Sequence, residues 1–359
     1  MKVFTKLFMI TIIVLSFSFT VGCSKTTVQL DEKVIELFMP KEEGVYVEKV
    51  GDNSMVVVRL NTDYGFKNYL EKGSSSIEEH LEYFEMAGID FYDKAKEMRG
   101  PFCTTYSAQN VAGDYLYGRN CDYFSDDTAI LLYTKPNDGY ASVSMTDGVY
   151  FGYENENSNI EEIKKYMKAA AYFPVDGMNE CGVAIASCSV LAKNKNELGK
   201  VSISSLNVIR LVLDYAKDVD EAVELMKKYN LYFELTDIVD QSHYMISDAT
   251  GKSVIVEFVK GEMIVLNSNY PWQVNTNFVI SNFEKEEDAL GVCYRYKLAF
   301  NDLKEKKGVL KENEPMELLS DVSQEHTLYS TVYNKTSGDI QVAIRRKYES
   351  TYQFKIEMK

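Results

Sequence analysis

A cysteine that closely follows a Gly-Pro pair is the feature that most constrains this sequence. The run Gly100-Pro101-Phe102-Cys103 ends any preceding helix at the proline and leads into a strand-like stretch. A thiol with its ordinary pKa of about 8.5 needs a base before it becomes a good nucleophile near neutral pH. The chain has three histidines, His80, His243 and His326, and none stands in a context that indicates a Cys–His pair. Cys103 therefore needs a base of another kind.

A free α-amine is the other base available near neutrality, because its pKa is about 8. Cleavage of the bond between Phe102 and Cys103 would give Cys103 such an amine on its own backbone. The sequence therefore predicts an internal nucleophile that must become a chain terminus before it can work.

The residues after Cys103 predict a β-hairpin. Residues 104–110 and 115–120 are strand-like, and a short turn rich in Gly and Asp separates them. We expect this hairpin to return Arg119 and Asp122 to the neighbourhood of Cys103. Arg119 would then stabilise a thiolate, and Asp122 would hold the α-amine by a charge-assisted hydrogen bond.

This pattern resembles the N-terminal-nucleophile (Ntn) amide hydrolases. Cys103-Thr104, a strand, a turn and Gly118-Arg119-Asn120-Cys121-Asp122 are similar to the choloylglycine hydrolase and penicillin V acylase family. The long segment before the cysteine resembles the precursors of isopenicillin-N acyltransferase and of acid-ceramidase-like enzymes. The resemblance covers roughly residues 100–357.

The resemblance implies three further site residues. Asn179, in an Asn-Glu-x-Gly turn, and Asn277, in a Val-x-Thr-Asn motif, would both donate to the oxyanion of the tetrahedral intermediate. A plain turn residue is the alternative for Asn179. Arg295 matches an arginine that the family places near the nucleophile, and a surface arginine on a helix is its alternative. The short interval from Asn277 to Arg295 departs from the choloylglycine hydrolases and leaves assembly and bile-salt specificity open.

The distribution of strands and helices predicts an α+β fold. Strand-like runs dominate both ends of residues 103–359, and helical runs such as 160–171, 204–215 and 219–229 lie between them. Two stacked antiparallel sheets with helices outside fit this order. The resemblance implies the four-layer αββα sandwich of the Ntn hydrolases, with Cys103 at the start of a central strand.

Residues 1–22 are expected to be an export signal rather than part of the fold. A positive start, an apolar run too short to span a membrane and small residues before Cys23 resemble a bacterial lipoprotein signal. The expected outcome is lipidation of Cys23 and anchoring to the outer face of a bacterial membrane. Ordinary secretory cleavage nearby, with Cys23 a bystander, is the alternative.

Residues 23–102 are expected to be a tether followed by a propeptide. Residues 24–40 are interpreted as tether, and residues 45–50 and 55–60 predict a strand hairpin. A helix is predicted from Ile77 to about Arg99, with His80 on its surface. The segment would cover Cys103 until cleavage, after which it either stays bound or leaves. A permanent N-terminal subdomain without cleavage is the alternative.

Composition excludes several classes of function. A net charge of −15 disfavours nucleic acid and electrostatic docking on anionic lipid. The six cysteines include no CxxC or Cys/His cluster, so no metal site is expected, and no cofactor is implied. Apart from Cys23 and Cys103, the cysteines are interpreted as small buried hydrophobes, with disulfides as the alternative.

Together these features predict a cysteine Ntn hydrolase of linear amide C–N bonds, acting on a small-molecule N-acyl amide. An acyltransferase on the same scaffold is one alternative, and acceptor amines would reveal it as a new amide. A non-catalytic solute-binding lipoprotein is the other, and an intact Phe102–Cys103 bond would favour it. The sequence leaves the acyl group and the amine open.

Overall fold

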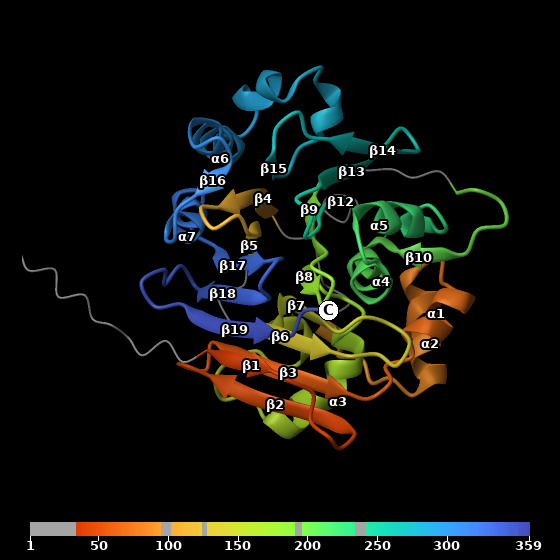
Figure 1. The fold of residues 1–359 in the computed structure, drawn as a ribbon. Helices are drawn as coiled ribbons and strands as arrows, with labels where there is room; N and C mark the ends of the chain where they lie inside the picture. Colours follow the sequence, from red (N-terminus) through yellow and green to blue (C-terminus); the bar gives the residue numbers. More distant parts are fainter. Residues whose placement is uncertain (1–33, 95–101, 124–127, 191–195, 234–241) are drawn as a thin grey trace, which may run out of the picture. The chain divides into compact units, whose positions relative to one another are not determined.

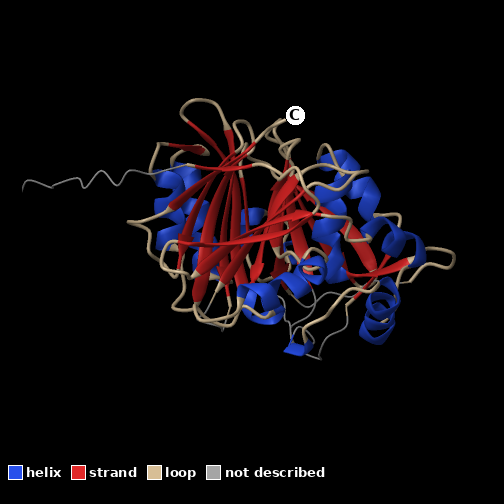
Figure 2. Ribbon diagram, turned by 90° about the horizontal axis from the view of Figure 1, so that it is seen from below, coloured by secondary structure: helices blue, strands red, loops and turns tan. Residues whose placement is uncertain are grey.

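Two stacked β-sheets with helices on their outer faces form the fold in this computed structural model (Figures 1 and 2). The structure describes residues 34–94, 102–123, 128–190, 196–233 and 242–359. The predicted signal peptide, Cys23 and the Gly100-Pro101 pair lie outside these residues.

The first sheet carries Cys103. Within the described residues it has eight strands in the order β1-β19-β18-β17-β5-β4-β15, with β16 beside β4. Its strands are β1 (Ile35–Leu37), β4 (Phe102–Asn110), β5 (Tyr115–Asp122), β15 (Gln273–Asn275), β16 (Val309–Leu310), β17 (Thr327–Asn334), β18 (Asp339–Ile344) and β19 (Tyr352–Ile356). The hairpin predicted after Cys103 is confirmed as β4 and β5.

The second sheet faces the first across the core. Its described strands follow the order β14-β13-β12-β9-β8-β7-β6-β3-β2. They are β2 (Gly44–Val50), β3 (Met55–Asn61), β6 (Ala129–Thr134), β7 (Ser142–Asp147), β8 (Asp176–Asn179), β9 (Ala184–Ser189), β12 (Ser242–Ser247), β13 (Ser253–Val259) and β14 (Glu262–Asn267). The central strands are buried along their whole length, because helices cover one face and the first sheet covers the other.

Helices cover both outer faces. The second sheet packs against α3 (Ile160–Ala170), α4 (Val208–Tyr215) and α5 (Val219–Met226), and the first against α6 (Tyr294–Glu305) and α7 (Glu314–Asp321). Two more helices, α1 (Phe66–Lys72) and α2 (Ile77–Ala87), lie near the short pair β10 (Ser202–Ser204) and β11 (Asn230–Tyr232). The predicted αββα architecture is confirmed, although the sheets are mixed, since β1–β19, β3–β6 and β16–β4 pair in parallel.

The segment before Cys103 contributes strands to both sheets. The predicted hairpin is confirmed as β2 and β3, and β3 pairs with β6 of the second sheet. β1 pairs with β19 at the edge of the first sheet. The tether expected over residues 24–40 is therefore wrong for residues 35–37. Residues 34–94 are built into the same fold as the nucleophile.

The helix predicted up to Arg99 is shorter than expected. It ends at Ala87, because Gly88 adopts a left-handed backbone (φ 63°) and its N–H closes the last turn on Phe84 and Glu85. Apolar residues beyond Gly88 continue at helical spacing but do not extend the helix. One of these, Phe91, packs against Phe84 from outside the helix.

His80 is fully buried, and its predicted surface position is wrong. Its ring stacks on Tyr69 at 4.6 Å between centroids and lies against Phe84 and Phe173. Burial lowers the pKa of His80 to about 3. The helical spacing of His80 and Phe84 puts both side chains on the same face, which is the face that packs inward.

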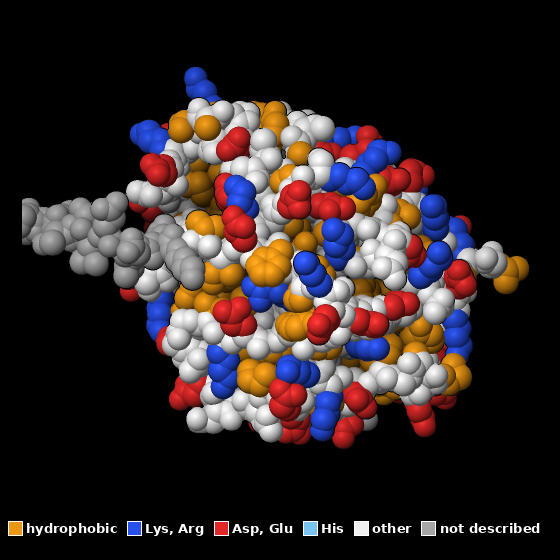
Figure 3. Space-filling view, turned by 60° about the horizontal axis from the view of Figure 1, so that its bottom comes forward, with side chains coloured by type: hydrophobic (Ala, Val, Ile, Leu, Met, Phe, Trp, Pro, Cys, Tyr) orange, Lys and Arg blue, Asp and Glu red, His pale blue; other side chains and the backbone are white. Residues whose placement is uncertain are grey.

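The surface carries charges of both signs. On the face in Figure 3, acidic and basic side chains are intermixed and alternate with small apolar areas. In the described part of the chain, no helix combines the length and the apolar character needed to cross a membrane.

The burial of His80 predicts a pH-dependent stability. Below pH 6.5 His80 becomes protonated in the unfolded chain, whereas in the folded chain it becomes protonated only near pH 3. The unfolding free energy therefore falls as the pH falls through this range. Between pH 6.5 and 5 this single group should cost about 2 kcal/mol of unfolding free energy. Denaturant titrations at several pH values would measure the slope. The H80F variant should flatten it, and an unchanged slope in H80F would contradict the assignment.

Candidate active site around Cys103

The pairing of β4 with β5 places the residues of the site. Cys103 lies directly opposite Cys121, and Phe102 lies opposite Asp122. Because side chains alternate along a strand, Cys103, Cys121 and Arg119 face the space between the sheets, whereas Asp122 faces the helices α6 and α7. Arg119 and Asp122 thus approach Cys103 from opposite faces of the first sheet.

Arg119 is fully buried and bridges the two sheets. Its Nε donates to Asp176 Oδ2 at 2.8 Å, and its Nη1 donates to the Ser187 carbonyl oxygen at 2.8 Å. Its Nη2 lies 3.8 Å from Cys121 Sγ. The guanidinium group is therefore fixed beside the thiols, as the predicted role in stabilising a thiolate requires.

Three cysteines meet at this point. The thiols of Cys121 and Cys188 both hydrogen-bond to Cys103, and all three side chains are fully buried and unpaired by disulfides. Burial raises the pKa of Cys103 well above its usual range, although Cys121 and the charge of Arg119 act against this. In the uncut chain the nucleophile is therefore a protonated thiol, which makes a nearby base necessary.

Asp122 and Arg295 lie on the other face of the sheet, beside the backbone of Cys103. Asp122 Oδ1 accepts a hydrogen bond of 2.6 Å from Thr327 Oγ1, and Oδ2 lies 3.5 Å from Arg295 Nη1. Arg295 Nη1 also donates to the Cys103 carbonyl oxygen and to Thr104 Oγ1. Burial raises the pKa of Asp122, and Thr327 and Arg295 offset part of that rise. The structure thus brings Arg295, which was expected from the family resemblance, to the nucleophile.

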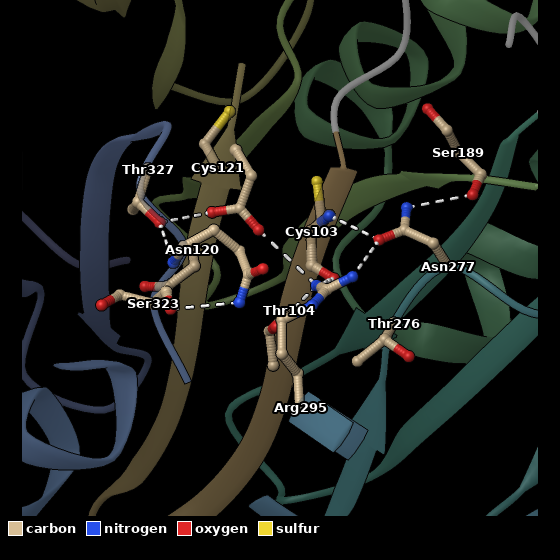
Figure 4. Close-up of polar contacts among 12 residues, drawn as sticks. Cys103, Thr104, Asn120, Cys121, Ser189, Thr276, Asn277, Arg295, Ser323 and Thr327 are labelled. Carbon is tan, nitrogen blue, oxygen red and sulfur yellow. Dashed lines mark hydrogen bonds and ion pairs between the residues drawn. The ribbon is translucent and has the colours of Figure 1, made fainter. Parts of the chain in front are cut away.

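Asn277 connects these groups (Figure 4). Its Oδ1 accepts the backbone N–H of Cys103 at 2.8 Å and Arg295 Nη2 at 2.9 Å, while its Nδ2 donates to the Ser189 carbonyl oxygen at 3.0 Å. In the uncut chain this N–H belongs to a peptide bond, and it marks the position that an α-amine would take after cleavage. The predicted meeting of Asn277 with Cys103 is present in the structure.

The structure does not bring Asn179 to the nucleophile. Its Nδ2 donates to the carbonyl oxygens of Leu213 and Ala216, and its Oδ1 accepts the N–H groups of Cys181 and Val183. The turn lies at the start of β9, whereas Cys103 meets Cys188 near the end of that strand. At about 3.3 Å per residue the two ends are well over 10 Å apart. The oxyanion role expected for Asn179 therefore gives way to the turn role.

Sequence reasoning missed several residues of the site. Ser189 follows Cys188 on β9, contacts Asn277 through its carbonyl group, and has a buried Oγ without a hydrogen-bond partner among the described residues. Thr327 and Asp176 are the hydrogen-bond partners of Asp122 and Arg119. No local signal marks these residues, since each reaches the site through sheet pairing over long sequence distances.

The comparisons with known proteins identify the family of this chain. The family model for linear amide C–N hydrolases, choloylglycine hydrolase family, matches residues 103–285, just over half of the chain. The match begins at Cys103 itself. The chain belongs to the choloylglycine hydrolase family. In this family member, residues 34–94 lie outside the matched region yet form part of both sheets.

Individual relatives are more distant. The bile salt hydrolase/transferase of Clostridium perfringens is 26% identical over 181 residues, which are 46% of this chain and 51% of that protein. The chain thus matches about half the length of this curated relative. A crystal structure of a variant of the conjugated bile acid hydrolase from Clostridium perfringens gives a TM-score of 0.51 at 19% identity and covers 70% of this chain and 92% of that one. The penicillin V acylase of Agrobacterium tumefaciens gives a TM-score of 0.49 at 18% identity, covering 67% and 83%.

The two asparagines predict opposite mutant phenotypes. N179A removes four buried hydrogen bonds and should lower the unfolding free energy by about 3 kcal/mol, while the folded fraction keeps its amide-hydrolysing rate within a few-fold. N277A removes three hydrogen bonds that are only part-buried, so it should lose less stability than N179A, but it should lose roughly 100-fold or more in rate, as expected for an oxyanion donor. Thermal melts and initial rates on an N-acyl amide would measure both. Equal loss of rate in two stable variants would restore Asn179 to the catalytic site.

Proposed function

We propose that this protein hydrolyses linear amide C–N bonds with Cys103 as nucleophile, after cleavage of the Phe102–Cys103 bond frees its α-amine. The observation that carries this proposal is the 2.8 Å hydrogen bond from the Cys103 backbone nitrogen to Asn277 Oδ1. A nitrogen held by a side chain, rather than by a neighbouring strand, keeps a fixed position after the peptide bond is broken.

The first step is cleavage of the chain itself. The Cys103 thiol attacks the Phe102 carbonyl carbon, its proton passes to the Cys103 nitrogen as the Phe102–Cys103 C–N bond breaks, and the acyl group moves from nitrogen to sulfur. Water then hydrolyses the thioester, giving a carboxylate on Phe102 and a free thiol and α-amine on Cys103. Asp122, buried opposite Phe102, supplies the negative charge that stabilises the ammonium group formed when this amine takes up the thiol proton.

The second step is turnover of substrate. The α-amine takes the thiol proton, the sulfur attacks the amide carbonyl, and negative charge develops on the carbonyl oxygen. Asn277 Nδ2 can donate to that oxygen if it exchanges its bond to Ser189, and such a donor is typically worth about 3 kcal/mol. The amine leaves with a proton, and water releases the acyl group from the sulfur. Arg119 and Arg295 keep the sulfur and the Cys103 backbone in place throughout.

The substrate class in this proposal is a small-molecule N-acyl amide. The printed name of the Clostridium perfringens relative includes transferase as well as hydrolase, so transfer of the acyl group to an added amine is the competing outcome. Product analysis with and without an acceptor amine separates the two reactions. Formation of a new amide at the expense of free acid would favour transfer.

The location in this proposal is the outer face of a bacterial membrane, with Cys23 as the lipid-bearing residue. The short apolar run and the small residues before Cys23 support it. After cleavage the lipidated piece would carry residues 34–94. Tyr64 in that piece donates a 2.6 Å hydrogen bond to buried Asp214, and β1 and β3 pair with β19 and β6. The two pieces are therefore expected to remain together.

Substitution of the nucleophile tests the two steps. C103A should give one uncut chain that hydrolyses no amide, and C103S should be cut and turn over more slowly, because the hydroxyl has a much higher pKa than the thiol. Intact-mass analysis and N-terminal sequencing would show whether residue 103 begins a chain. Amide hydrolysis by C103A, or full activity in an uncut wild-type chain, would refute the proposal.

The front piece and the catalytic chain should separate only on unfolding. In the cut protein both fragments should elute together on size exclusion and part in denaturant at the same concentration at which the fold is lost. C103A is the control, since its single chain cannot separate. Elution of residues 103–359 alone under native conditions would show that the front piece leaves.

A further inference from the structure

A histidine–glutamate pair lies buried directly behind the segment that carries Asn277. His243 on β12 and Glu257 on β13 are inaccessible, with side chains 0% and 1% exposed, and His243 Nδ1 lies 3.3 Å from Glu257 Oε1. The other ring nitrogen, Nε2, lies 2.6 Å from the carbonyl oxygen of Thr276. His243 thus contacts the residue immediately before Asn277.

Glu257 holds the same segment from its other side. Its Oε1 accepts the N–H of Ile280 at 2.7 Å, and its Oε2 accepts the N–H of Ser281 at 3.0 Å. Together the pair fixes the backbone at Thr276 and again at Ile280 and Ser281. Asn277 lies between these fixed points.

The hydrogen-bond partners determine where the protons are. A carbonyl oxygen can only accept, so His243 Nε2 must carry a proton to donate to Thr276. Both oxygens of Glu257 accept backbone N–H groups, which favours the carboxylate, and its Oε1 also faces His243 Nδ1. Burial acts to raise the pKa of Glu257, but the hydrogen bonds from His243 and Ser281 lower it overall. The pair thus consists of a ring that donates from Nε2 and a carboxylate that accepts from the backbone.

Apolar side chains would fill this space at least as well as the pair does, because a buried carboxylate loses its hydration. A second titratable neighbour, Cys188, lies directly opposite His243 on β9 and belongs to the thiol group around Cys103. The pair therefore lies between the nucleophile's surroundings and the Asn277 segment.

We propose that His243 and Glu257 are positioning residues that keep the Asn277 side chain aligned between Cys103, Arg295 and Ser189. The part of this inference that concerns rate rests on the proposed amide hydrolysis. The chemical reason is that Asn277 makes three directional hydrogen bonds, and a displacement of about 1 Å at a reacting centre can cost roughly 100-fold in rate. The pair acts through the Thr276 carbonyl group and does not touch the reacting atoms.

Nuclear magnetic resonance tests the proton assignment independently of catalysis. The chain has only three histidines, so 15N-histidine labelling gives at most three rings, and H80F and H326Q identify the other two. His243 should show a proton on Nε2 that is hydrogen-bonded to the Thr276 carbonyl oxygen. A wild-type His243 ring without a proton on Nε2 would overturn this contact.

Kinetics test the positioning role. E257Q and H243A should lower kcat of hydrolysis and the rate of self-cleavage 10-fold or more, with KM changed less than 3-fold. H243Q retains a donor for the Thr276 carbonyl and should recover part of the loss. H80F is the matched control, being an equally buried histidine on another element, and should keep kcat. Rates are taken per folded molecule, with circular dichroism confirming the fold of E257Q, the most conservative variant.

The outcomes separate this inference from the proposed function. A wild-type protein without amidase activity would refute the proposed function and leave the resonance result to decide the proton assignment. An active wild-type protein in which folded E257Q and H243A retain kcat within 2-fold would refute the positioning role alone.

Discussion

The antiparallel pairing of β4 with β5 is the constraint on which the site depends. It sends the Cys103 side chain into the space between the sheets, beside Arg119, and leaves the Cys103 backbone facing Asn277 and Arg295. A slip of one residue would exchange these two environments. Gly118 and the ring of Tyr106, its partner on β4, pack so closely that a Cβ on Gly118 would lie 2.1 Å from the ring. This contact helps to fix the register. The glycine before Arg119 is therefore needed for packing.

Charges in the interior are paired or hydrogen-bonded almost wherever they occur in the described residues. Arg119 pairs with Asp176 next to the thiols, and Arg210 pairs with Asp214 where the front segment docks. Lys335 shows the cost of a poorer environment, because it has only two serine hydroxyls as hydrogen-bond partners and burial lowers its pKa to about 7. The same loss of hydration disfavours a thiolate in this interior, so the thiol stays protonated until a base is provided.

Local patterns predicted the part of the site that lies close together in the chain, since the hairpin after Cys103 followed from strand-like runs around a turn. The meeting of Asn277 and Arg295 with Cys103 was expected only from the resemblance to the amide hydrolases. The oxyanion role expected for Asn179 does not hold, because an Asn-Glu-x-Gly turn does not indicate at which end of a strand pair the nucleophile lies. The surface position predicted for His80 was wrong because a single polar residue on an apolar helical face was interpreted as solvent-exposed.

Other contacts of the Asn277 segment could not be predicted from the sequence. Ser189, His243 and Glu257 come from three different strands, and only the register of the second sheet brings them to the segment of Asn277. A single sequence contains no periodicity or spacing that specifies that register.

The strands that the front segment contributes to both sheets affect how the protein could refold after cleavage. While the chain is continuous, β1 and β3 reach their partners by intramolecular search. Once the Phe102–Cys103 bond is broken, the same pairing becomes a bimolecular reaction that depends on concentration. An unfolded two-piece protein would then regain its shape slowly at cellular dilution, so its lifetime would be governed by the barrier to unfolding. In such a protein the order of events, folding first and scission afterwards, is irreversible.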